Sequence, residues 1–114
     1  MVTLYGLKNC STCKKALQWM NAQNIEHEFI DYRQSPLSRS QVERYGEQLG
    51  WGKLINRAST TWRNLPEGQK EPQNNADWLG LVEAHPTLIR RPLAVSGDEV
   101  RAGFKLDEWV DWLA

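Results

Sequence analysis

The 114-residue sequence has few cysteines and no long apolar segment. Its two cysteines are too few for a disulfide-stapled scaffold. No apolar run approaches the roughly 20 residues that span a bilayer. Residues 1–6 lack the basic and apolar regions of a secretion signal. We therefore expect a cytoplasmic protein that does not bind membranes, in a reducing compartment that disfavours permanent disulfides.

Neither sign of charge is in excess. The 14 Lys and Arg residues balance 14 Asp and Glu residues, and the pI is about 6.7. This balance removes the global electrostatic case for direct binding of nucleic acid. The chain also lacks the glycine-rich loops that cradle nucleotide phosphates. We expect no resident cofactor, and a monomer.

The first 32 residues predict a strand, a helix and a second strand. Residues 2–5 are β-branched and aromatic, and Gly6 ends them. From Cys13 onward, apolar side chains recur at the spacing of one helix face. Residues 25–32 partly alternate between apolar and polar, as a half-buried strand does. Such a βαβ unit normally has parallel strands.

The middle of the chain, residues 33–85, predicts a helical insert. Capping-box patterns at Ser38 and at Ser40 both open a helix that Gly50 would stop. Asn75 would cap a second helix that ends at residues 85–86, and residues 66–75 read as a loop.

The remainder, residues 86–114, predicts three strands and a final helix. Strands are expected at residues 87–89, 93–96 and 99–101, the last two joined by a turn at residues 97–98. A helix at residues 107–113 would place Trp109, Val110 and Leu113 on one side. The whole predicts an α/β protein with a mixed sheet, namely one thioredoxin-like domain (residues 1–114). Its core would be residues 1–32 and 86–114.

Four of the tryptophans have a predicted place in the packing of the protein. Trp78 and Trp109 lie on apolar helix faces and are expected in the core. Trp51 and Trp62 flank Arg57, where they would either pack in the core or line a groove.

The most informative motif is Cys10-Ser-Thr-Cys13, placed between the first strand and the first helix. A C-x-x-C motif in this setting indicates thiol redox chemistry. Cys10 would precede the first helical turn, where free N–H groups and the helix dipole favour a thiolate. Lys8 adds positive charge nearby, and the more buried Cys13 would resolve a mixed disulfide formed on Cys10.

Two other interpretations of the cysteines are open. A zinc site would need more ligands than this pair and two isolated histidines provide. Two inert core thiols fit Cys13, which falls on the apolar face of its helix, better than they fit Cys10.

Cationic residues and one proline complete the candidate site. Arg57, Arg91 and Lys105 would bind an oxyanion or a carboxylate if the fold brought them near Cys10. Solvated side chains on separate faces are the alternative. Pro92 reads, from the residues alone, as a trans proline that opens an edge strand, because only about 5% of X–Pro bonds are cis.

Taken together, these segments resemble the ArsC/Spx family of thioredoxin-fold proteins, and the YffB-type members most. That family includes glutaredoxin-coupled arsenate reductases, the Spx transcriptional regulators, and YffB-type proteins proposed to be glutathione-dependent thiol reductases. The matching segments are residues 2–5, 10–16, 31–32, 54–63, 86–93 and 103–105.

The resemblance implies roles for individual residues. Cys10 would be the nucleophile, Pro92 would be cis and present backbone to the substrate, and Arg57 and Arg91 would face Cys10. Two positions depart from the well-studied arsenate reductases. Gly6 stands where those enzymes have a histidine, and Lys105 stands in place of a third arginine.

The expected function is a cytosolic thiol–disulfide oxidoreductase. It would use glutathione as a co-substrate, with glutaredoxin as a possible partner, and would act on a disulfide or a small oxyanion. One alternative is a glutathione- and glutaredoxin-coupled arsenate reductase. A second is an Spx-like regulator that binds RNA polymerase through a redox switch, although the chain lacks the C-terminal extension associated with Spx.

Overall fold

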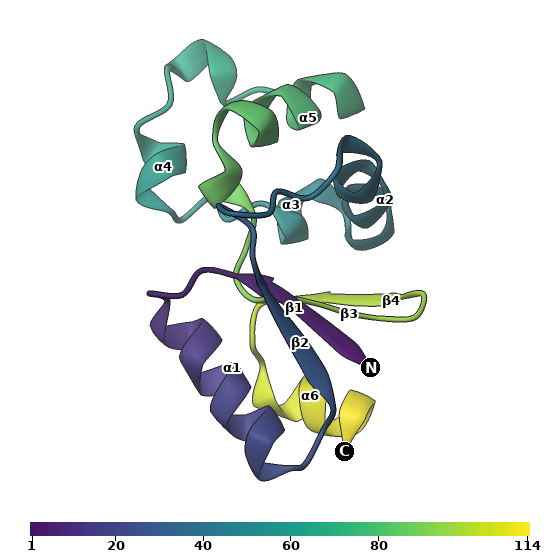
Figure 1. Ribbon diagram of the computed structural model, residues 1–114. Helices are drawn as coiled ribbons and strands as arrows, with labels where there is room; N and C mark the ends of the chain where they lie inside the picture. Colours follow the sequence, from purple (N-terminus) through teal and green to yellow (C-terminus); the bar gives the residue numbers. More distant parts are fainter. The chain divides into compact units, whose positions relative to one another are not determined.

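The computed structural model describes residues 1–114 and divides them into two units. Residues 1–35 and 91–114 form a sheet unit, and residues 36–90 form a helical unit. The chain passes from one unit to the other after Ser35 and returns after Arg90. Each unit is described separately below (Figure 1).

The sheet unit begins with the expected strand, helix and strand. Strand β1 (Val2–Gly6) buries alternate residues, as its sequence pattern predicts. Helix α1 (Ser11–Ala22) buries Cys13, Ala16 and Met20 on one stripe. Strand β2 (His27–Asp31) pairs with β1 in parallel, with Gly6 opposite Asp31. The carboxyl ends of both strands therefore lie beside the start of α1.

A hairpin completes the sheet on the other side of β1. Strand β3 (Leu93–Ser96) pairs antiparallel with β1, and strand β4 (Glu99–Ala102) pairs antiparallel with β3. Gly97 adopts a φ of 59° in the turn, a left-handed conformation that glycine permits. The strand order is β2-β1-β3-β4. The predicted α/β fold with a mixed sheet is confirmed.

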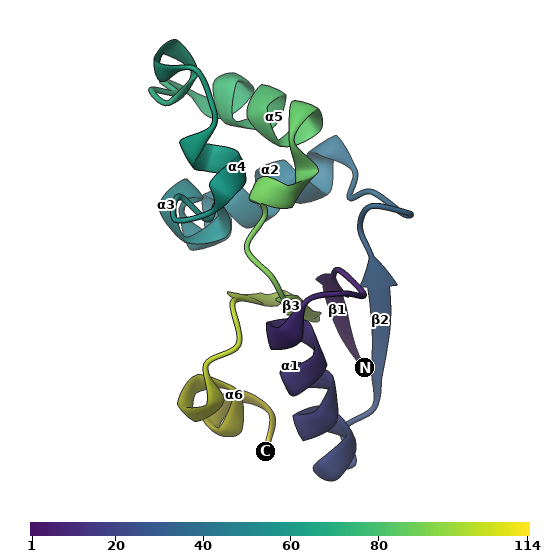
Figure 2. The same ribbon diagram turned by 90° about the vertical axis from the view of Figure 1, so that its left-hand side faces the viewer.

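Both helices of this unit pack on the same face of the sheet (Figures 1 and 2). Helix α6 (Leu106–Leu113) lies beside α1, and its Trp109 is fully buried. The Trp109 ring meets Phe104 at 4.8 Å and Trp19 at 6.2 Å between centroids, both edge-on. The core below the sheet consists of Val2, Leu4, Ala16, Met20, Ala94 and Trp109.

The helical unit contains four α-helices and two 3₁₀ turns. Helix α2 (Arg39–Leu49) opens with a capping box in which Ser38 Oγ accepts from Gln41 N at 3.1 Å. Gly50 stops it with a φ of 87°. The other elements are α3 (Trp51–Leu54), α4 (Thr60–Arg63), η1 (Glu67–Gln69), α5 (Asn75–Ala84) and η2 (Pro86–Leu88).

Three tryptophans stack in the helical unit. The buried Trp78 ring lies parallel to Trp51 at 5.7 Å and nearly parallel to Trp62 at 6.1 Å. The indole of Trp51 also donates to Asn75 Oδ1 at 2.9 Å. The predicted burial of Trp78 and Trp109 is confirmed. Trp51 and Trp62 are half-buried and pack against Trp78.

Three local predictions are wrong. Residues 87–89 do not form a strand, because Pro86 starts the 3₁₀ turn η2 and only Ile89 makes an isolated bridge, to Ile55. The cap of α5 is Asn74, whose extended backbone lets its side chain accept from Asp77 N at 2.9 Å. Val110 is 41% exposed, since one residue along a helix turns the side chain about 100° from the buried Trp109.

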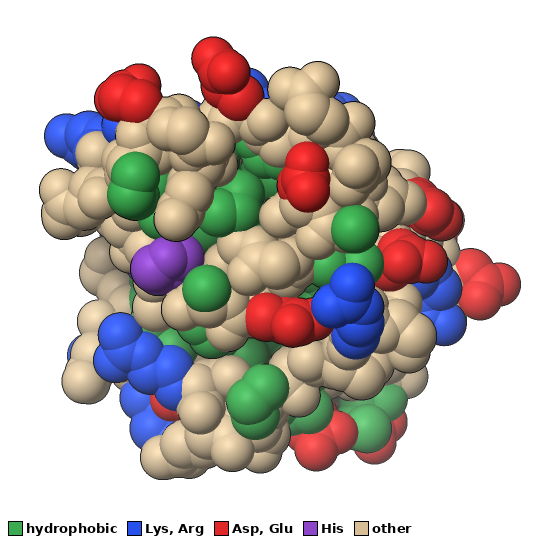
Figure 3. Space-filling model, turned by 90° about the horizontal axis from the view of Figure 1, so that it is seen from above, with side chains coloured by type: hydrophobic (Ala, Val, Ile, Leu, Met, Phe, Trp, Pro, Cys, Tyr) green, Lys and Arg blue, Asp and Glu red, His purple; other side chains and the backbone are tan.

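The surface carries charges of both signs. Figure 3 shows acidic and basic side chains mixed over one face, with hydrophobic side chains between them. Among the helices, none combines the length and the apolar character needed to cross a bilayer.

Burial of Trp109 predicts a strong dependence of stability on this side chain. Trp109→Ala is expected to lower the free energy of unfolding by about 3–5 kcal/mol, because a large buried ring is lost and a cavity remains. Val110→Ala, one residue further along α6, is expected to change it by less than about 0.5 kcal/mol. Urea unfolding of both variants measures the difference, and equal losses would contradict the packing described for α6.

Candidate active site

The candidate site lies where α1 begins. Cys10 is the residue that precedes the helix, with extended backbone angles (φ −98°, ψ 120°), and its side chain is half-buried. Its carbonyl accepts the first helical bond, from Lys14 N at 3.0 Å. Polar side chains at this position accept hydrogen bonds from the free N–H groups of the first turn. A thiolate at Cys10 occupies the same electrostatic position.

The surroundings of Cys10 favour its thiolate. Partial burial opposes ionisation, but the backbone N–H and thiol of Cys13, the Arg91 guanidinium and the Thr12 N–H together hold the pKa of Cys10 below its ordinary value. All four groups offer positive charge or a hydrogen atom to the sulfur. Such an environment stabilises a cysteine thiolate, and it favours thiol chemistry at Cys10 over the interpretation as two inert core thiols.

Cys13 has the opposite environment. It is 1% exposed, and burial raises its pKa to about 11, with a further contribution from the neighbouring Cys10 thiolate. Cys13 is therefore a protonated thiol at neutral pH, while Cys10 is the sulfur that ionises first. Both cysteines are free thiols.

Gly6 leaves the room that Cys13 occupies. A Cβ added at Gly6 would lie 2.5 Å from Cys13 Sγ and 3.2 Å from Phe29 Cε1. Real Cβ atoms do not approach other atoms as closely as 2.5 Å, so any side chain at position 6 would displace the sulfur. The end of β1 and the second cysteine are therefore matched in shape.

Arg91 is the cation beside Cys10. Although partial burial opposes its charge, the Tyr32 hydroxyl and the Cys10 thiolate raise the pKa of the guanidinium. Arg91 Nη1 donates to Tyr32 Oη at 3.3 Å. The Arg91–Pro92 peptide bond is cis, as the family resemblance implied, and Pro92 is buried. The interpretation from the residues alone, a trans proline that opens an edge strand, is wrong, because β3 lies between β1 and β4. The role of Pro92 as substrate-facing backbone stays a prediction.

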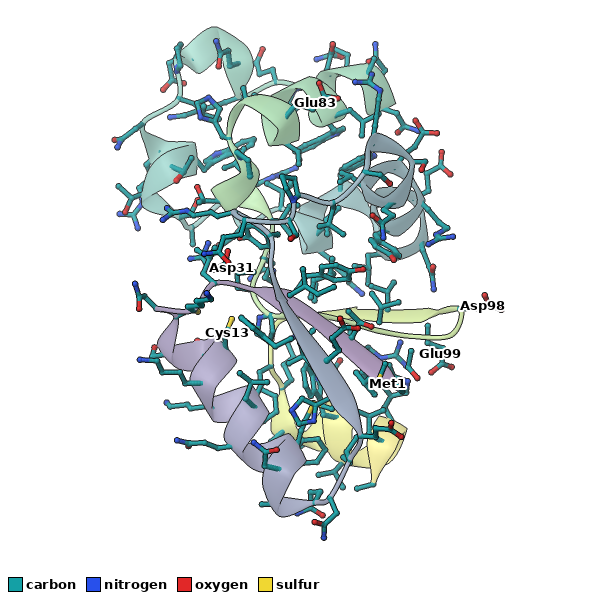
Figure 4. The ribbon with its side chains drawn as sticks, in the orientation of Figure 1. Met1, Cys13, Asp31, Glu83, Asp98 and Glu99 are labelled. Atoms are coloured by element: carbon teal, nitrogen blue, oxygen red, sulfur yellow. The ribbon has the colours of Figure 1, made fainter.

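An open pocket of about 740 Å³ surrounds Cys10 within the sheet unit. Its lining includes three cations, Lys8, Arg33 and Arg91, and one carboxylate, Asp31. Figure 4 shows Cys13 at the start of α1 and Asp31 near the same end of the sheet. The predicted proximity of Lys8 and Arg91 to Cys10 is therefore present in the structure.

Asp31 holds the loop before Cys10. Its carboxylate accepts from Arg33 N at 2.9 Å and from Lys8 N at 3.4 Å. Desolvation opposes its charge, but these N–H groups, that of Gln34 and the Lys8 ammonium together lower the pKa of Asp31 below its ordinary value. Asp31 is thus a fixed negative charge in an otherwise cationic pocket.

Two of the predicted cations do not line this pocket. Lys105 is exposed and precedes α6, where its carbonyl accepts from Trp109 N at 3.0 Å. Arg57 belongs to the helical unit, and its guanidinium lies 5.4 Å from the Trp78 ring and 5.6 Å from the Trp62 ring. Their roles in anion binding stay predictions. No group of three or more His, Cys, Asp or Glu residues is placed to hold a metal ion.

Sequence reasoning did not select Asp31, Tyr32 or Arg33 as site residues. The available signal was the parallel βαβ unit, because the carboxyl ends of neighbouring parallel strands meet at one edge of the sheet. The residues at the end of β2 and directly after it therefore had to lie beside the loop that follows β1.

Comparisons with known proteins place this chain among ArsC-family sequences. Residues 5–112 match the model of the ArsC family. An uncharacterised protein of Haemophilus influenzae is 41% identical over 96% of both chains. A Spx global transcriptional regulator of Streptococcus mutans is 29% identical, over 95% of this chain and 80% of the regulator.

Solved structures of similar proteins include members related to arsenate reductases. A protein named YFFB is 36% identical, and its structure superposes on this one with a TM-score of 0.93 over the full length of both chains. An arsenate reductase (ArsC) related protein of Brucella melitensis is 34% identical, with a TM-score of 0.78 over 97% of this chain and 92% of that one.

The contact between Gly6 and Cys13 predicts a coupled effect on stability. Gly6→Ala is expected to lower the free energy of unfolding by about 1–3 kcal/mol, because the added methyl overlaps Cys13 Sγ. The loss should be smaller in a Cys13→Ala background, where the nearest retained atom of residue 13 is 3.6 Å away. Chemical denaturation of the four proteins in reducing buffer measures this coupling.

Gly52→Ala is the matched control. Gly52 lies in α3 with no atom within 4 Å of an added Cβ, so this change is expected to be neutral or stabilising. An equal loss from Gly6→Ala with and without the Cys13 sulfur would contradict the steric account.

Proposed function

This chain belongs to the ArsC family, and the solved structures similar to it include an arsenate reductase related protein. We propose that the chain is a thiol–disulfide oxidoreductase that uses glutathione as its reductant. The observation that carries the proposal is the asymmetry of the two thiols. Cys10 has a lowered pKa and lines an open pocket, whereas Cys13 is buried behind it with a pKa of about 11.

The reaction begins with Cys10. Its thiolate attacks one sulfur of a disulfide substrate, the substrate's S–S bond breaks, and the released thiolate takes a proton from solvent. The product is a mixed disulfide on Cys10. Arg91 and the N–H groups at the start of α1 stabilise the attacking thiolate, and they would stabilise it again when Cys10 becomes the leaving group.

The mixed disulfide is then resolved by a thiolate of glutathione or of Cys13. If Cys13 attacks, a Cys10–Cys13 disulfide forms, the substrate thiolate leaves, and two glutathione molecules then reduce this disulfide. When glutathione attacks the mixed disulfide, it releases either the substrate thiol or Cys10 and forms a new mixed disulfide with the other sulfur. A second glutathione then attacks this new disulfide and leaves as part of oxidised glutathione. In total, two glutathione molecules are oxidised to their disulfide while one substrate disulfide is reduced to two thiols. Cys13 can resolve only after it loses its proton, which its raised pKa disfavours at neutral pH.

The charges of the pocket support glutathione as the reductant. Glutathione has two carboxylates and one ammonium group. The pocket offers three cations, Lys8, Arg33 and Arg91, and one carboxylate, Asp31. Arginine forks and lysine bind carboxylates, and an ammonium group suits Asp31. A small oxyanion would use the cations alone.

Reduction of arsenate is the nearer alternative. Arg91 beside Cys10 favours it, because a guanidinium binds an oxyanion next to the attacking sulfur. Gly6 disfavours arsenate reduction, because the histidine that the well-studied arsenate reductases have at this position would not fit next to the Cys13 sulfur. A redox-switched partner of RNA polymerase is the alternative of another class, and its support is the similarity to Spx.

Substitution of each cysteine tests the proposed reaction. Cys10→Ser is expected to reduce glutathione-dependent reduction of hydroxyethyl disulfide to the uncatalysed rate. Cys13→Ser is expected to keep part of the activity, because glutathione resolves the mixed disulfide. Consumption of NADPH by added glutathione reductase measures both variants.

The alternatives give different results. Equal loss in both variants would show an obligatory Cys10–Cys13 disulfide and contradict resolution by glutathione. Turnover with arsenate, glutathione and glutaredoxin, but not with disulfides, would identify an arsenate reductase. No turnover with either substrate, together with a stoichiometric complex with RNA polymerase that depends on oxidation, would identify a regulator.

A further inference from the structure

Tyr32 is a buried polar side chain next to the candidate site. It follows β2 directly, is 1% exposed, and donates its backbone N–H to Gly6 O at 3.1 Å. This bond extends the parallel pairing of β1 and β2 by one residue. The position of the Tyr32 backbone is therefore fixed by the sheet.

The Tyr32 hydroxyl contacts the guanidinium that stabilises Cys10. Arg91 Nη1 donates to Tyr32 Oη at 3.3 Å, and the same guanidinium interacts with the Cys10 sulfur and lines its pocket. Arginine has many rotamers, so a fixed hydrogen-bond acceptor determines where its charge lies.

We propose that Tyr32 is a positioning residue whose hydroxyl orients Arg91 toward Cys10 and thereby sets the reactivity of that thiol. Tyr32 does not touch the reacting sulfur in this mechanism; it acts through Arg91. The inference deepens the proposed function and rests on the thiol chemistry of Cys10.

A phenol suits this role better than a carboxylate would. An aspartate or glutamate would orient Arg91 equally well, but its negative charge would offset the guanidinium's charge near the thiolate. Burial raises the pKa of Tyr32 above its ordinary value, so its hydroxyl is neutral at physiological pH. Arg91 therefore keeps its full positive charge for Cys10 and for an incoming anion.

Tyr32→Phe removes only the hydroxyl and tests the proposal. The expected result is alkylation of Cys10 by iodoacetamide that is about three- to tenfold slower at a pH below its pKa, because less thiolate is present. The full pH–rate curve should shift to higher pH, while the rate of the fully ionised thiol changes little. A merely structural role of the hydroxyl would not move this curve.

Tyr45→Phe is the matched control. Tyr45 is also buried, 4% exposed, and its hydroxyl accepts from Arg44 Nη2 at the same distance of 3.3 Å. It belongs to the helical unit and is not among the residues around Cys10. This variant is expected to leave the pH–rate curve of Cys10 unchanged.

A double-mutant cycle with Arg91→Gln shows whether Tyr32 acts through Arg91. Arg91→Gln alone should slow the alkylation of Cys10, and Tyr32→Phe should add no further change in that background. An additional loss of the same size in the double variant would overturn the proposal, as would an unshifted curve for Tyr32→Phe alone.

The same data separate this inference from the proposed function. If the wild-type Cys10 pKa is not lowered, the proposed thiol chemistry fails together with the role of Tyr32. If the wild-type pKa is lowered and Tyr32→Phe does not move it, only the positioning role is overturned. Circular dichroism and thermal unfolding of each variant confirm that the compared proteins are folded.

Discussion

The start of α1 is the feature on which the site depends. At this point the helix has N–H groups without intrahelical partners, and Cys10 stands where a capping side chain would accept from them. A neutral thiol is a poor acceptor, whereas a thiolate is a good one. The same helix end therefore favours ionisation of Cys10, and Arg91 adds a full positive charge to this effect. The parallel pairing of β1 and β2 and the antiparallel pairing of β3 bring these groups together.

The second cysteine gives the site its direction. Cys13 lies one helical turn inside α1, faces the core, and fits against Gly6 at the end of β1. Because the two sulfurs have such different environments, they differ in how readily they ionise. In the proposed reaction Cys10 attacks the substrate. Cys13 is a protonated neighbour that stabilises the Cys10 thiolate and becomes a nucleophile only when deprotonated. Asp31 gives the pocket a mixed charge, which matches a ligand that carries both carboxylates and an ammonium group.

Much of the fold followed from the sequence because its signals were local. Alternation identified β1, helical spacing identified α1, and capping residues identified α2. The Cys10 motif was identified for the same reason. Tertiary effects were not predictable in this way. Leu88 and Ile89 resemble a strand, but Pro86 starts a 3₁₀ turn and both residues are buried in the helical unit. Likewise, nothing in the residues around Tyr32 indicates that its hydroxyl meets Arg91, 59 positions away, because that contact arises from the arrangement of the sheet.

The proposed chemistry requires that the surroundings of Cys10, and Arg91 above all other side-chain cations, activate this thiol. The most direct test is the pH dependence of Cys10 alkylation in the reduced wild-type protein and in Arg91→Gln, with mass spectrometry to identify the modified cysteine and Cys13→Ser as a control. We predict a wild-type pKa well below the ordinary value of about 8.5 and a higher one in Arg91→Gln. A wild-type pKa at or above the ordinary value, or the same pKa in both proteins, would contradict the account.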